Sequence, residues 1–196
     1  MADRFRTFVA VELPDEIREE LVRLRGEMDC GELDVRWSDP RTMHLTLKSL
    51  GDVSADSIGE VVEACRRAAA GCAEPPEIAV GGLILFPSPD RPKVVAAHAE
   101  GGEPLRALQA AVEGELSAIG YPPEGRGWNP HVTVGRVKTR GRGKYDKARD
   151  AKGQSGALPI GRVEADEVVV FQSELRPEGA EHAPLARIKL GPRHGG

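Results

Sequence analysis

The chain carries the stretch HLTL at residues 44–47 and repeats it as HVTV at residues 131–134. Each copy alternates polar and apolar residues, which is typical of a half-buried β-strand whose successive side chains point to opposite faces. Each copy therefore places a histidine and a threonine on one face and two aliphatic side chains on the other. One copy alone would be read as structural. Two copies with matching aliphatic flanks favour a shared functional site.

Bulk composition limits the class of protein. The chain has 196 residues, of which 40% are hydrophobic and 30% charged, as in globular proteins. No apolar run approaches the roughly 20 residues that span a bilayer, and the N-terminal residues lack the apolar stretch of a signal peptide. We therefore expect a cytoplasmic monomer with no membrane contact and no obligate protein partner.

The net charge and the spacing of the histidines and cysteines argue against non-specific binding of long nucleic acids and against a metal site. The net charge is −4, so a nucleic-acid substrate would need a local basic patch or would be held mainly at one end. The histidines show no metal-ligand spacing such as HExxH. Cys30, Cys65 and Cys72 form no CxxC pair, and we interpret them as reduced apolar residues. We expect no metal and no cofactor.

The predicted elements follow the same order in both halves of the chain. Pro14 and Pro104 lie near helix starts, and Ser54 is a good N-cap for another helix. This order predicts an α+β fold in one bilobal domain over residues 1–196, with approximate repeats at 5–90 and 91–175. Chance similarity of two α+β halves is the alternative. The remaining predicted strands are residues 5–11, 78–86, 93–98, 163–171 and 185–190, and a short helix is expected in the basic segment 138–156.

Two imidazoles and two hydroxyls suit hydrolysis of a phosphodiester. Imidazole, with an ordinary pKa near 6.5, acts as a base or an acid at neutral pH. The in-line geometry of phosphoryl transfer needs these two groups on opposite sides of phosphorus, as a pseudo-twofold axis would place them. Hydroxyls can donate to the phosphate oxygens. A strained 2′,3′-cyclic phosphate fits best, because it opens without a metal. This symmetry leaves open which histidine is the acid.

The chain resembles the 2H phosphoesterase superfamily, whose defining feature is a pair of His-x-Thr-x motifs. Within it, the chain is similar to the RNA 2′,3′-cyclic phosphodiesterases, also called 2′–5′ RNA ligase-like proteins. The similar segments stand in family order and cover most of the chain: residues 6–14, 35–37, 44–52, 130–137 and 171–175.

The resemblance implies a bilobal fold with antiparallel sheets lining a central groove and helices outside. It also implies metal-independent opening of a terminal RNA 2′,3′-cyclic phosphate to a 2′-phosphate. Carried over motif by motif, His44 is the proton donor and His131 the proton acceptor, and Thr46 and Thr133 bind the substrate phosphate. The implied partner is RNA with a 2′,3′-cyclic phosphate end.

Further residues are candidates for substrate contact, each beside a structural interpretation. Arg136 could bind the phosphate, but strict alternation turns it away from His131. Arg126 could reach the site or be a solvated loop residue. Trp128 or Trp37 could stack on a base or pack in the core. The basic run from Lys138 to residue 144 could contact RNA or be a solvated loop.

The chain departs from the family at three positions that bear on substrate preference and on contacts at the edge of the cleft. Ser49 stands where the family usually has an aromatic residue, His182 near where it often has a tyrosine, and Trp128 where it usually has a phenylalanine. Three other functions stay open: 2′–5′ RNA ligation at the same site, a non-catalytic module that binds RNA ends, and a phosphodiesterase for small cyclic nucleotides.

Overall fold

The computed structural model describes residues 3–28, 33–88, 91–123, 125, 127–138, 159–176 and 179–191. It has the α+β composition that the sequence predicts. The elements are, in order, β1 (Arg4–Glu12), α1 (Asp15–Glu27), β2 (Val35–Trp37), the 3-10 turn η1 (Pro40–Thr42), β3 (His44–Ser54), the 3-10 turn η2 (Ala55–Ser57), α2 (Ile58–Ala70), β4 (Glu77–Phe86), β5 (Val94–Glu100), α3 (Gly102–Ala118), β6 (His131–Val137), β7 (Gly161–Glu164), β8 (Glu167–Arg176) and β9 (Gly179–Lys189).

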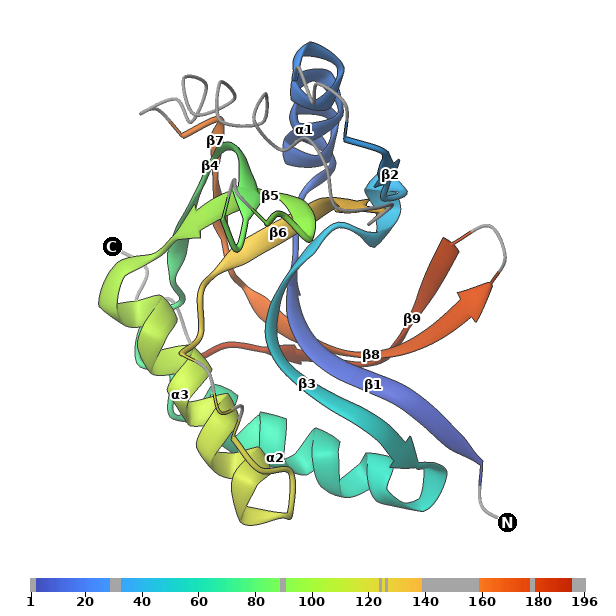
Figure 1. Cartoon of the computed structure of the whole chain (residues 1–196). Coiled ribbons are helices and arrows are strands. Elements are labelled where there is room, and N and C mark those ends of the chain that lie inside the picture. Colours follow the sequence, from blue (N-terminus) through green and yellow to red (C-terminus); the bar gives the residue numbers. More distant parts are fainter. Residues whose placement is uncertain are drawn as a thin grey trace.

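The strands form one antiparallel sheet in the order β7-β4-β5-β6-β3-β1-β8-β9, with β2 added on β6. Figure 1 shows this sheet curling, with β6 and β3 side by side at its middle. The order is symmetric about that middle, because β5 and β1, β4 and β8, and β7 and β9 stand at matching distances from it. The two expected antiparallel sheets are therefore halves of one continuous sheet.

The helices cover one face of the sheet. Helices α2 and α3 lie side by side below the curl in Figure 1 and contact each other. The buried core combines Leu21 of α1, Val61 of α2 and Leu108 of α3 with the aliphatic residues of both repeated stretches. The other face carries a small separate cluster that includes Phe8 and Phe171. No helix among the described residues is long and apolar enough to cross a membrane.

Three predicted elements differ from the structure. The single strand expected over residues 163–171 is two strands, because β7 ends at Glu164 on β4 and β8 begins at Glu167 on β1. Ser54 begins the turn η2 without a side-chain cap, and helix α2 starts only at Ile58. The last strand begins at Gly179 rather than at residue 185, because it pairs with β8 along nearly its whole length. The helix expected within residues 138–156 falls mostly outside the described residues.

A buried ion pair connects α3 to the sheet. The Lys48 side chain on β3 has no exposed surface, and its Nζ donates to Glu113 Oε1 at 2.6 Å. Nζ also donates to the carbonyl of Pro122 at 2.9 Å. The second oxygen of Glu113 accepts from Gln109 at 2.9 Å. The lysine charge is thus paired and hydrogen-bonded, as burial of a charge requires.

Candidate active site

The four motif residues meet at the middle of the sheet. Leu45 of β3 pairs with Val132 of β6, and both side chains are buried on the helix side. In this antiparallel register His44 lies across from Thr133, and Thr46 lies across from His131. Side-chain alternation turns all four toward the opposite side of the sheet, which we call the motif face. The two histidines are then diagonal neighbours across the two strands.

Both histidines are oriented by the same local hydrogen bond. Nδ1 of His44 donates to the carbonyl of Thr42 at 2.7 Å, and Nδ1 of His131 donates to the carbonyl of Asn129 at 2.8 Å. A carbonyl oxygen can only accept, so Nδ1 carries the proton in each ring. The other ring nitrogen, Nε2, is left for proton transfer.

A phenylalanine stacks on each of these imidazoles. The ring centroids of Phe8 and His44 are 4.6 Å apart, and those of Phe86 and His131 are 4.7 Å apart. Sequence reasoning missed both phenylalanines, because their contacts depend on the pairing of strands distant in the chain. The only sequence signal for these two contacts was that both phenylalanines lie in apolar segments predicted to be strands.

Burial sets the charge state of His44. It lowers the pKa of His44 to about 4. The Thr42 carbonyl and the Glu12 carboxylate oppose this shift, whereas Arg18, and His182 whenever it is protonated, add to it. Glu12 stands directly across from His44 on β1. His44 is therefore neutral at neutral pH in the free protein.

Arg136 lies on the motif face, so the strict alternation that turned it away from His131 is wrong. A β-bulge between β5 and β6 places the pair Ala96–Thr133 next to the pair Val95–Gly135. The extra residue on β6 reverses the alternation beyond it. Arg136 then stands across from Val94.

A second β-bulge occupies the matching place in the first half. The register between β1 and β3 shifts next to Thr46, and Ser49 then stands across from Phe8. Because Phe8 stacks on His44, Ser49 shares the motif face. Ser49 and Arg136 are thus equivalent positions with different side chains, and only one of them supplies a cation.

The tryptophans have structural contacts. Trp128 donates from Nε1 to the carbonyl of Thr46 at 3.1 Å, which ties the loop before His131 to β3. Trp37 packs over Gly135, where an added Cβ would lie 2.8 Å from the indole. Both rings pack partly buried against the core. Arg126 and the basic residues 140–144 lie outside the described residues.

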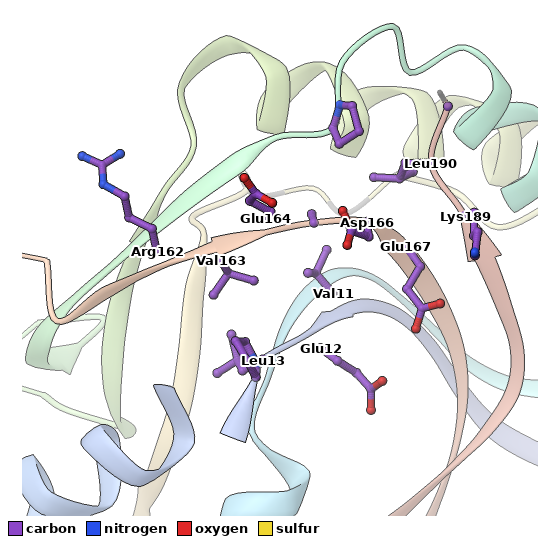
Figure 2. A pocket seen from close by; sticks show the side chains of 14 residues that line it. Val11, Glu12, Leu13, Arg162, Val163, Glu164, Asp166, Glu167, Lys189 and Leu190 are labelled. Atoms are coloured by element: carbon purple, nitrogen blue, oxygen red, sulfur yellow. The ribbon is translucent and has the colours of Figure 1, made fainter. Parts of the chain in front are cut away.

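An acidic cavity of about 930 Å³ lies where the end of β1 meets β7, β8 and the end of β9, and Glu12, which stands across from His44, lines it. Figure 2 shows the side chains of Glu12, Glu164, Asp166 and Glu167 around it, against the cations Arg162 and Lys189. Glu12 and Glu167 both pair with Arg187. This lining disfavours a phosphate. Among the residues that the structure covers, no cluster of histidine, cysteine and carboxylate side chains has the arrangement to hold a metal ion.

A curled antiparallel sheet that brings two His-x-Thr pairs to one face defines a two-histidine phosphoesterase. The family model described as LigT like Phosphoesterase matches residues 11–96 and again residues 95–180. The chain belongs to this family of LigT-like phosphoesterases.

Individual relatives agree with this membership. The RNA 2′,3′-cyclic phosphodiesterase of Methanothermobacter thermautotrophicus is 31% identical over 95% of this chain and 100% of its own length. The protein of the same name from Aeropyrum pernix is 31% identical over 86% of this chain and 94% of its own.

Solved structures share the fold. The Thermus thermophilus protein TT0787 has a TM-score of 0.74 and 24% identity, covering 94% of this chain and 97% of its own. Apo E. coli LigT has a TM-score of 0.71 and 20% identity, covering 96% and 99%. These likenesses support the two-lobed α+β architecture.

Proposed function

We propose that this protein opens the terminal 2′,3′-cyclic phosphate of RNA to a 2′-phosphate without a metal. The observation that carries the proposal is the single strand register that sets both His-x-Thr pairs around one place on the motif face. The curated relatives that match nearly the whole chain are named RNA 2′,3′-cyclic phosphodiesterase, which supports this substrate class.

The proposed chemistry uses both Nε2 atoms. His131 takes a proton from water, whose oxygen attacks phosphorus. The bond from phosphorus to O3′ breaks, and His44 gives its proton to O3′. The products are a free 3′-hydroxyl and a 2′-phosphate, and proton exchange with solvent restores both rings. Thr46 and Thr133 donate to the non-bridging oxygens, where charge develops. The assignment of donor and acceptor follows the family resemblance.

The low pKa of His44 has a consequence for this scheme. The donor must be charged when the bond breaks, yet the free protein holds it neutral. A cyclic phosphate beside the ring carries one negative charge, and an opposite charge nearby favours the imidazolium. His44 therefore gains its proton together with the substrate.

A local concentration of cations beside the second motif supports an RNA substrate. Arg36 and Arg136 are directly paired on β2 and β6. Lys93 and Lys138 lie at the same end of the strands, where their backbones bond to Val137 and Asp34. These four residues, the β2–β6 basic surface, are exposed and contrast with the net charge of −4. An RNA strand that leaves the site over the β2–β6 basic surface would avoid the acidic cavity.

The deciding experiment is turnover of a short RNA that ends in a 2′,3′-cyclic phosphate, with the product isomer identified. We expect a 2′-phosphate, a chelator-resistant rate, and a loss of about 10²-fold or more in His44→Ala and in His131→Ala. The same RNA with a linear 3′-phosphate is the substrate control, and circular dichroism checks the fold. Full activity in either variant contradicts the proposal.

The same assay separates the other candidate reactions. Adding a 5′-hydroxyl RNA shows whether ligation to a 2′–5′ bond occurs. Binding without turnover would indicate a module for RNA ends, and a preference for cyclic mononucleotides would indicate a small-molecule enzyme. We also propose that the chain is a single bilobal domain, acts as a monomer without an obligate protein partner, and works in the cytoplasm.

A further inference from the structure

A third imidazole stands against His44. The ring centroid of His182 on β9 is 5.2 Å from that of His44 and 5.0 Å from that of Phe8, with the ring planes nearly perpendicular in both contacts. Phe171 lies 6.3 Å away on the same side. His182 therefore completes an aromatic wall around His44, made of Phe8, Phe171 and His182.

The second motif has no such wall in the described part of the chain. The ring contact recorded there for His131 is with Phe86. The strand that matches β9 in the symmetric sheet order is β7, which has 4 residues against 11 in β9. The described residues of β7 pair with Glu77–Val80 of β4, at the opposite end of that strand from Phe86. Two histidines with the same motif and the same Nδ1 hydrogen bond thus have different surroundings.

His182 is suited to act as an uncharged aromatic contact rather than as an acid or a base. Its Nδ1 is buried and has no hydrogen-bond partner among the described residues. Burial lowers the pKa of His182, and an interaction with the Glu181 backbone opposes this only in part. A lowered pKa favours a neutral ring at neutral pH.

We propose that His182 is a positioning residue that completes the aromatic wall around His44. The wall gives His44 a different chemical environment from His131, although the two histidines lie in the same repeated motif. The wall excludes water from His44 and fixes its ring beside Phe8. Its relevance to catalysis rests on the proposed function, but its physical effect exists in the free protein. The charged groups that face His44 are Glu12 and Arg18, and Glu181 is the carboxylate next to His182.

The test is the NMR titration of the His44 ring in the substrate-free protein, comparing His182→Ala with His182→Phe. Alanine opens the wall, so we expect water to raise the pKa of His44 by about 1 unit or more toward its ordinary value. Phenylalanine keeps an aromatic surface, so the titration should stay within about 0.5 unit of the wild type. His182→Asn serves as a second opening variant if the alanine variant does not fold.

Each result decides the proposal. A raised titration in the opening variants but not in His182→Phe supports it. An unchanged pKa of His44 in His182→Ala and His182→Asn overturns the proposal, even if the variants are less stable. His182 would then have a packing role only. An equal rise in His182→Phe overturns it too, because the imidazole itself would then be responsible. If the wild type shows no turnover, the proposed function fails while this titration still stands on its own.

A kinetic readout then links the wall to the reaction. In an active wild type, the limb of the pH profile of kcat/KM that reports His44 should move with the NMR titration in His182→Ala. His98→Ala is the control for the loss of an imidazole elsewhere on the motif face, because His98 stands beside His131 rather than His44. The His44 titration should be unchanged in this control.

Discussion

Leu45 and Val132 form the one residue pair that joins β3 to β6 within the described chain. Each side chain is almost fully buried against the helices, which fixes the register and keeps it from slipping. A shift by one residue would turn one His-x-Thr pair into the core. The contact between two aliphatic residues therefore determines that both histidines share a face.

The threonine hydroxyls can be tested without disturbing the sheet. Thr46→Val and Thr133→Val keep the side-chain shape and remove a donor to the phosphate, so each should lower kcat by about 10²-fold. Steady-state kinetics on the cyclic-phosphate RNA measures this loss. Thr7→Val is the matched control, because Thr7 is buried and donates to the carbonyl of Phe5. A loss in the control as large as in the motif variants would indicate a general effect on the strands.

The depressed pKa of His44 makes stability depend on pH. In the unfolded chain His44 titrates near 6.5, whereas in the folded protein its pKa is about 4. The unfolded state binds the extra proton, so this contribution is fully present above pH 6.5 and is lost as the pH falls toward 4. The loss amounts to about 3 kcal/mol.

Urea unfolding between pH 7 and pH 4 checks this dependence. Compared with wild type, His44→Gln should lose about 3 kcal/mol less stability over this range. Between pH 7 and pH 8 the two proteins should show the same slope, which is the internal control. Parallel curves over the whole range would show that His44 is not held neutral by the fold.

Arg136 provides a test of the path of the RNA. Arg136→Ala should lower kcat/KM by about tenfold on an RNA oligonucleotide, because one charge-assisted contact to phosphate is lost. The salt dependence of binding should weaken at the same time. Arg162→Ala is the matched control, since this exposed arginine pairs with Glu77 beside the acidic cavity. An equal loss in both variants would contradict a path over the β2–β6 basic surface.

The ion pair of Lys48 and Glu113 predicts a stability effect separate from catalysis. Glu113→Gln leaves the fully buried ammonium of Lys48 without a counter-charge. We expect a loss of about 2 kcal/mol in the free energy of unfolding, less than for a fully buried pair because Glu113 is partly exposed. Glu115→Gln removes the exposed partner of Arg67 and should change it by less than about 0.5 kcal/mol.

Much of the fold, and the shared face of the four residues of the proposed site, were readable from the sequence. Alternation in residues 44–47 and 131–134 predicted two half-buried strands with histidine and threonine on one face, and strands β3 and β6 confirm it. The order of strands and helices predicted an α+β chain, and the family matches confirm the phosphoesterase class. These features are local, because side-chain periodicity is a property of a few consecutive residues.

The tertiary structure decided the rest. Strict alternation misplaced Arg136, because a β-bulge adds a residue that no local pattern reveals. The stacking of Phe8 and Phe86 and the approach of His182 depend on pairing between strands far apart in the chain. The sequence by itself determined which side chains are candidates for the proposed chemistry. Cross-strand register and burial determined which of them meet, since both are set by contacts between distant segments.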